Sequence, residues 1–238
     1  MKINKIAVFD SGMGGLGTFK LLATTKLCKE LIYYADNKNV PYGEKTKDDL
    51  IKMCQNSVDY LSKFDVDIII FACNTASSVV KYLKSNIEIL PISDYTIKGI
   101  ASFKNSNNAL IAATRAMLNS GLYQEACKNN NIEADFISPI DFVPIVESMQ
   151  FSDSATLFNK YFPKNSYDYV VFACTHYPFL RNEFANYFKN AKLIDPAEIL
   201  LQHLLNVYEE QDNFPILNFK ASKDVDILKT FYERIKDA

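Results

Sequence analysis

The stretch Ile68-Ile69-Ile70-Phe71-Ala72-Cys73-Asn74-Thr75-Ala76-Ser77-Ser78 decides the fold of this 238-residue chain. A run of β-branched and apolar residues stops abruptly at a cysteine, and small polar residues that favour the start of a helix follow it. Much of this pattern returns in the second half of the chain, where Val170-Val171-Phe172-Ala173 leads to Cys174-Thr175-His176. We therefore expect two similar units, each of which places a cysteine at the carboxyl end of a buried strand.

Apolar strand patterns alternate with helical patterns along the whole chain, which is typical of parallel sheets with helices on both faces. The predicted fold class is therefore α/β, with two pseudo-symmetric parallel-sheet domains that face each other across a central cleft. We expect residues 1–93 plus 207–238 to form the first domain, on the side of Cys73. Residues 94–206 would form the second, on the side of Cys174, so the last strand and helix would return to the first domain.

Three further segments bear on a site at this cleft. Asp10 and Ser11 end the first strand pattern, and the glycine-rich residues 12–17 after them allow backbone amides to approach a ligand closely. In open α/β sheets ligands bind at this carboxyl edge. Residues 77–85 are predicted to form a helix, and residues 143–147 are predicted to form a turn that carries the carboxylate of Glu147.

Composition and charge exclude several classes of protein. The net charge of −2 and the sequence pI near 5.8 provide no basic surface for nucleic acid or anionic lipid. The first apolar run lasts only from Ile6 to Phe9, which is shorter than a secretory signal requires, and no segment approaches the length of a membrane span. We therefore expect a cytoplasmic protein without a nucleic-acid or membrane partner.

The five cysteines fall into two groups. None forms a Cys-x-x-Cys pair, and with only two histidines no zinc spacing can be assembled, so we predict no metal site. An odd number of cysteines in a chain without an export signal favours reduced thiols. Cys28, Cys54 and Cys127 lie in helical patterns and are expected to be core residues. Cys73 and Cys174 remain as the candidates for chemistry.

Two equivalent thiols facing one cleft favour acid–base chemistry over a disulfide or a metal site. One group would remove a proton from a carbon atom and the other would return a proton to the opposite face, which inverts the stereocentre. A free thiol has a pKa of about 8.5, and we expect the adjacent helix start to lower that pKa toward neutrality. Asp10 and His176 would tune the thiols, and donors for the carboxylate and amine groups of a substrate would come from Ser11, Asn74, Thr75 and Thr175.

Four signatures in this chain resemble those of the glutamate racemase family. They are Asp10-Ser11-Gly12-x-Gly14-Gly15, Pro41-Tyr42-Gly43, Cys73-Asn74-Thr75-Ala76 and Cys174-Thr175-His176-Tyr177-Pro178. The resemblance implies an enzyme without a cofactor that interconverts L- and D-glutamate and supplies D-glutamate for peptidoglycan. It also implies two pseudo-symmetric α/β domains, and it is compatible with a homodimer because the oligomeric state varies within the family.

The resemblance carries roles to individual positions. Cys73 and Cys174 match the two catalytic acid/base cysteines, which serve the D and the L face of the substrate respectively. Asp10, His176 and Glu147 match residues that assist them. The substrate-contacting positions implied by the resemblance are Asp10, Ser11, Tyr42, Gly43, Asn74, Thr75, Thr114, Thr175 and His176.

Other interpretations of the same sequence stay open. Several positions depart from the family pattern, namely Ser93-Asp94-Tyr95, Met117, Ala173 and Asp195-Pro196-Ala197-Glu198. These changes could alter substrate fit or domain closure without removing the chemistry. Within the same superfamily, a racemase of aspartate or hydantoin, or an isomerase that uses one cysteine as a nucleophile, is an alternative. A degenerate racemase that only binds an amino acid or a protein partner is another, and a pyridoxal enzyme is a third.

Overall fold

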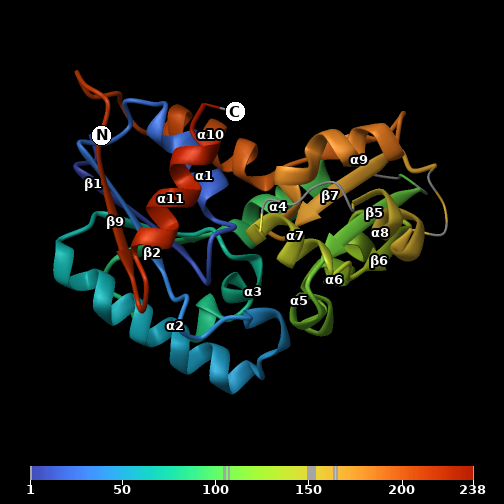
Figure 1. The fold of residues 1–238 in the computed structure, drawn as a ribbon, viewed down its shortest axis with the longest axis horizontal. Helices are drawn as coiled ribbons and strands as arrows, with labels where there is room; N and C mark the ends of the chain where they lie inside the picture. The colour runs from blue at the N-terminus through green and yellow to red at the C-terminus, as the bar shows by residue number, and fades with distance from the viewer. Residues whose placement is uncertain are drawn as a thin grey trace.

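The computed structural model describes residues 2–103, 106, 108–148, 154–162, 164 and 166–237. Its strands form two separate parallel sheets, which confirms the predicted fold class (Figure 1). The first sheet has the order β4-β3-β1-β2-β9, with β1 (Lys5–Asp10), β2 (Glu30–Ala35), β3 (Ile68–Phe71), β4 (Glu88–Pro91) and β9 (Ile216–Ala221). The second has the order β6-β5-β7-β8, with β5 (Ala109–Ala113), β6 (Ala134–Ile137), β7 (Tyr169–Ala173) and β8 (Lys192–Ile194).

Strand register brings the predicted site residues to one edge of each sheet. In the first sheet Phe9 of β1 pairs with Phe71 of β3, so the residues that follow both strands emerge side by side. In the second sheet Ala113 of β5 pairs with Ala173 of β7, so Thr114 and Cys174 emerge together in the same way. These central strands are almost wholly buried, as expected of the apolar runs in parallel sheets.

Helices cover both faces of each sheet. Around the first sheet lie α1 (Leu16–Ala23), α2 (Lys47–Leu61), α3 (Asn74–Ser77) and α11 (Asp226–Ile235), and around the second lie α5 (Arg115–Asn119), α6 (Leu122–Asn129), α7 (Phe142–Ser148), α8 (Ser154–Tyr161) and α9 (Arg181–Tyr187). Two more, α4 (Ile92–Ala101) and α10 (Pro196–Val207), pack against each other. Short 3-10 helices complete the set: η1 (Tyr42–Glu44), η2 (Ser62–Phe64), η3 (Val80–Tyr82) and η5 (Tyr177–Leu180).

Aromatic side chains fill much of the space between sheets and helices. Around the first sheet, Phe19 of α1 contacts Tyr33 of β2, Phe219 of β9 and Tyr232 of α11. Around the second sheet, Phe158 of α8 and Phe184 of α9 pack against each other in a T-shaped arrangement. Each fully buried ring of this kind contributes about 1.5–3 kcal/mol through burial alone. Both groups of rings belong to one continuous cluster of buried residues, which packs against both sheets.

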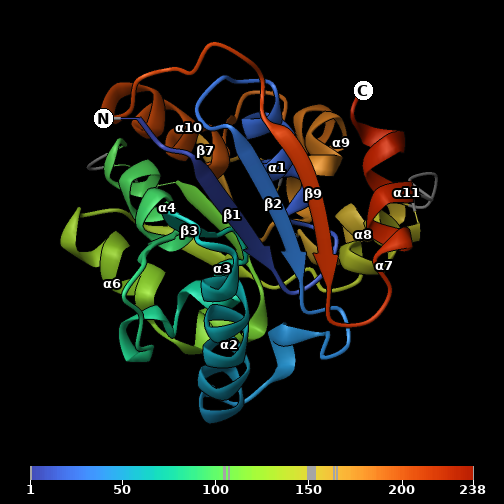
Figure 2. The ribbon, with the colours of Figure 1, turned by 90° about the vertical axis from the view of Figure 1, so that its left-hand side faces the viewer.

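The C-terminal segment returns to the first sheet, as predicted. Strand β9 pairs in parallel with β2, with Phe219 opposite Tyr33 (Figure 2). The proposed boundaries after residues 93 and 206 stay a prediction. In the described part of the chain no helix combines the length and the apolar character that crossing a membrane requires.

Two local predictions near the site are wrong. Residues 77–85 do not form one helix, because α3 ends at Ser77 and only the short η3 follows. The hydroxyls of Ser77 and Ser78 donate to the backbone carbonyls of Cys73 and Thr75, which competes with helix propagation. Residues 143–147 are not a turn but belong to α7, where Pro144 occupies the first helical turn and needs no backbone N–H.

Candidate active site

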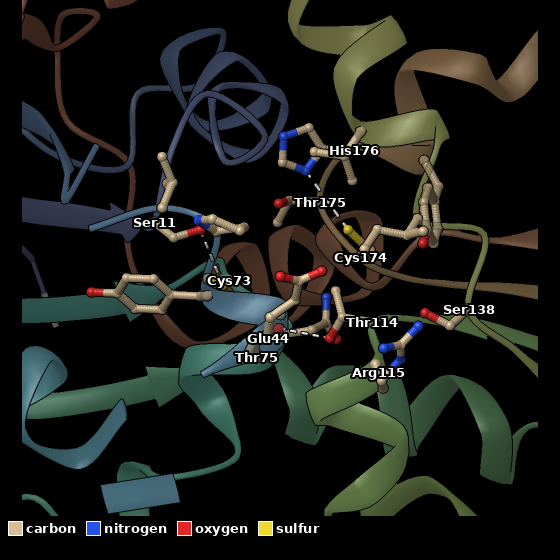
Figure 3. A pocket seen from close by; sticks show the side chains of 18 of the residues that line it. Ser11, Glu44, Cys73, Thr75, Thr114, Arg115, Ser138, Cys174, Thr175 and His176 are labelled. Atoms are coloured by element: carbon tan, nitrogen blue, oxygen red, sulfur yellow. Dashed lines mark hydrogen bonds between the residues drawn. The ribbon is translucent and has the colours of Figure 1, made fainter. Parts of the chain in front are cut away.

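A cavity of about 470 Å³ lies where the carboxyl ends of the two sheets meet (Figure 3). Every predicted site residue except Asp10 lines it. The segments around the first sheet supply Ser11, Tyr42, Gly43, Cys73, Asn74 and Thr75, and those around the second sheet supply Thr114, Glu147, Cys174, Thr175 and His176. The two thiols therefore open into one cavity from different sheets.

Cys73 lies at the end of β3 and caps the N-terminus of α3. Its Sγ accepts a hydrogen bond from the backbone N–H of Ala76 at 3.5 Å, and its thiol donates to Ser11 Oγ at 3.7 Å. Burial raises the pKa of Cys73 to about 12, the nearby Asp10 carboxylate acts in the same direction, and the Ala76 amide only partly opposes them. The expected lowering of this pKa is therefore wrong, because α3 has only four residues and its partial charge cannot offset the lost hydration.

Cys174 is linked to a chain of polar groups on the second sheet. Its Sγ lies 3.7 Å from His176 Nδ1, and His176 Nε2 lies 3.1 Å from Glu147 Oε1. Burial acts to lower the pKa of His176, but the hydrogen bonds and charges of Cys174 and Glu147 outweigh it and raise the pKa to about 10. The imidazole is consequently protonated at neutral pH and donates one ring N–H to the sulfur and the other to the carboxylate.

Asp10 lies beneath the cavity and connects its two halves. The carboxyl group is fully buried, and it accepts hydrogen bonds from the Gly12 backbone N–H at 2.8 Å and from Thr175 Oγ1 at 3.1 Å. Burial raises the pKa of Asp10, while the charge of His176 and these two hydrogen bonds oppose that shift. Asp10 thus lies next to both thiol environments, although it does not line the cavity.

The glycine-rich turn is necessary for this close approach. A Cβ atom on Gly14 would lie 2.3 Å from Thr175 Oγ1 and 2.8 Å from His176 Nδ1. No real Cβ atom tolerates such distances. The glycines after β1 therefore serve to bring the two halves of the chain into contact, in addition to exposing backbone amides.

Contacts across the cleft also hold the polar wall of the cavity. Thr75 Oγ1 and Thr114 Oγ1 are 2.8 Å apart, and the Cβ of Thr114 packs closely against Gly43. Asn74 Oδ1 accepts hydrogen bonds from the hydroxyls of Thr96 and Tyr123. Because both hydroxyls are used on the oxygen, the amide NH₂ of Asn74 is the group left to donate to a ligand.

The structure refines one predicted contact and adds residues that the sequence analysis does not include. The hydroxyl of Tyr42 donates to Asp36 Oδ2 at 2.7 Å, so its phenol is engaged outside the cavity. Glu44, Arg115, Ser138 and Asp141 line the cavity as well. Glu44 and Arg115 directly follow the predicted Gly43 and Thr114, which is the signal that could have identified them. Nothing in the sequence indicates that Thr96 and Tyr123 orient Asn74.

Fold and site together define a two-domain α/β protein in which two thiols line one cavity. The chain belongs to the Asp/Glu/Hydantoin racemase family, whose model matches residues 23–204. It is 35% identical to the glutamate racemase of Campylobacter jejuni over 243 residues, covering 94% of this chain and 95% of the relative. It is also 35% identical to that of a Nitratiruptor species over 240 residues, covering 95% and 90%.

The solved structures that this chain resembles include those of glutamate racemases. A crystal structure of glutamate racemase from Campylobacter jejuni matches with a TM-score of 0.92 at 32% identity, covering 98% of both chains. The glutamate racemase of Francisella tularensis, in complex with D-glutamate, matches with a TM-score of 0.85 at 26% identity, covering 100% of this chain and 95% of the other.

Proposed function

We propose that this chain is a glutamate racemase that interconverts L- and D-glutamate by two-base proton transfer between Cys73 and Cys174. The observation that carries the proposal is that two cysteines, delivered by equivalent strands of two sheets, line the same cavity. A reaction that inverts one carbon centre needs a proton acceptor on one face and a proton donor on the other. The names of the relatives support glutamate as the substrate.

The two thiol environments suit opposite roles in the conversion of L- to D-glutamate. His176 Nδ1 lies 3.7 Å from Cys174 Sγ, within reach for proton exchange, so we assign Cys174 as the base that removes the α-proton. The raised pKa of Cys73 keeps its thiol protonated, so that this group can deliver a proton to the opposite face. After one turnover Cys174 carries the proton and Cys73 is the thiolate, and proton exchange with solvent restores the starting state.

Polar groups around the thiols would stabilise the negative charge that develops during proton removal. The amide NH₂ of Asn74 and the hydroxyls of Thr75 and Thr175 line the same cavity as the two thiols. Hydrogen-bond donors aimed at the α-carboxylate lower the barrier because that group accepts charge when the α-proton leaves. In this proposal the protein's own residues carry out the reaction without a cofactor, in the cytoplasm, and the product D-glutamate is used for peptidoglycan.

The proposal is tested by following the α-proton of L-glutamate by NMR in heavy water, together with optical rotation. The native chain should exchange the α-proton and lose optical rotation, whereas Cys73→Ser and Cys174→Ser should both be severely impaired. Cys127→Ser is the matched control, because Cys127 is a buried thiol of the α6 core that does not line the cavity. This variant should keep the native rate.

Other outcomes would point elsewhere within the family. If the folded native chain leaves L-glutamate unchanged, glutamate racemisation is excluded. A panel of aspartate and hydantoins then tests the other substrates that the family description includes. Binding of glutamate without α-proton exchange would instead identify a protein that binds the amino acid without turning it over.

A further inference from the structure

The charged side chains that line the cavity differ in whether they have a partner. Among the described residues that line it, the cationic side chains are His176 and Arg115. His176 is engaged between Cys174 and Glu147, and the Asp141 carboxylate is paired with Lys160 at 2.6 Å. Arg115 makes no hydrogen bond or ion pair within the described ranges, so the cavity retains one unused guanidinium.

The backbone at Arg115 is held in a fixed position. Arg115 is the first residue of α5 and follows Thr114, whose side chain caps that helix by accepting from the Met117 backbone N–H at 3.3 Å. The same Thr114 hydroxyl contacts Thr75 across the cleft. In Figure 3 the guanidinium lies on the wall formed by the segments around the second sheet, beside Ser138. Arg115 is exposed and lines the cavity, so a long cationic side chain extends from an anchored base along the cavity wall.

We infer that Arg115 binds the distal carboxylate of the substrate and thereby sets the preference for a dicarboxylic amino acid, an inference that rests on the proposed glutamate activity. The donors of Asn74, Thr75 and Thr175 suffice for an α-carboxylate, but a second carboxylate needs its own partner. The cavity also contains the carboxylate of Glu44, which repels a second anion. A guanidinium offers two parallel N–H donors that match a carboxylate and supplies the compensating charge.

The decisive comparison is between L-glutamate and L-glutamine, which differ in the charge of the distal group and hardly in shape. For Arg115→Ala we expect the KM for L-glutamate to rise about tenfold, because a hydrogen bond to a charged group is lost. The inhibition constant of L-glutamine in the same assay should change less than about twofold, since no charge pair is involved. Arg115→Lys should give an intermediate KM, because it keeps the charge and loses the paired donors.

Controls separate this role from others. Lys192→Ala removes an exposed cation that does not line the cavity, and it should leave both constants unchanged. The inference would be overturned if Arg115→Ala raised the KM for L-glutamate and the inhibition constant of L-glutamine by the same factor, or changed neither. So would recovery of the native KM in Glu44→Ala/Arg115→Ala, because Arg115 would then serve only to neutralise Glu44. A native chain that does not racemise glutamate would contradict the proposed function itself, which is a separate result.

Discussion

Thr175 donates its hydroxyl to the buried carboxyl group of Asp10 at 3.1 Å, and this bond joins the two sheets directly beneath the cavity. Each partner lies close to one thiol, since Thr175 follows Cys174 and Asp10 influences the pKa of Cys73. The two cysteines are therefore not independent, because a change at one sheet edge reaches the other through this hydrogen bond.

Replacing Asp10 by asparagine should lower the pKa of Cys73. The Asp10 carboxylate is one of the causes that raise this pKa, so removing its charge should shift the alkylation of Cys73 by iodoacetamide to lower pH. The measurement uses Cys174→Ser as background and quantifies the modified Cys73 peptide by mass spectrometry across a pH series. Asp67→Asn is the matched control because Asp67 precedes β3, at the opposite end of the strand from Cys73. An unchanged pH profile in Asp10→Asn would contradict the electrostatic link.

Replacing Glu147 by glutamine should lower the pKa of His176 and slow the reaction. Glu147 is one of the two groups that hold this pKa at about 10, and an amide cannot supply the same charge. NMR titration of the His176 ring should detect the shift, and the racemisation rate should fall by about tenfold, as expected for losing a hydrogen bond to a charged group. A lower rate with an unchanged ring titration would mean that Glu147 acts on the substrate and not through His176.

The same pair predicts how stability depends on pH. Because folding raises the pKa of His176, its contribution to the free energy of unfolding is fully present below about 6.5 and is lost as the pH rises through about 10. In Glu147→Gln this loss should be smaller. Urea unfolding of the native protein and of Glu147→Gln between those pH values checks the prediction. It would be contradicted if the free energy of unfolding fell equally steeply with pH in both.

Replacing Gly14 by alanine should destabilise the chain by about 1–3 kcal/mol and impair catalysis, because the added methyl group overlaps Thr175 and His176. Gly17→Ala is the matched control. Gly17 lies in α1, where an added Cβ meets Phe179 at an ordinary contact distance of 3.4 Å, and alanine there should stabilise the helix by up to about 1 kcal/mol. Thermal unfolding compares the stability of the two variants. If Gly14→Ala is as stable as Gly17→Ala, the contact of Gly14 with Thr175 and His176 has room for a methyl group and the prediction is contradicted.

The architecture and most of the cavity lining could be predicted from the sequence because they follow from the order of apolar and polar residues over short stretches. The apolar runs that end at Cys73 and Cys174 define strand ends, and parallel strands place their carboxyl ends at one edge. A hydrophobic pattern of period two or 3.6 is enough for that inference.

Features that depend on tertiary packing could not be predicted in this way. The pKa of Cys73 depends on complete burial beside Asp10, and neither is visible in the residues that surround it in the sequence. The orientation of Asn74 depends on Tyr123, which lies 49 positions away. The helical state of residues 142–148 depends on burying Phe142 and Val146 on one face, whereas Pro144 taken alone suggests a turn.

The pairing of β9 with β2 has a consequence for how the protein is made. A ribosome has to synthesise residue 221 before the first sheet can acquire its last strand, although the second sheet is complete by residue 194. Sequential folding during translation would therefore leave the Cys73 side unfinished while the Cys174 side is already formed. If translation stops before β9 is made, the edge of β2 stays unpaired. Such an unpaired edge can pair with a strand of another chain, so a chain truncated at this point should aggregate more readily.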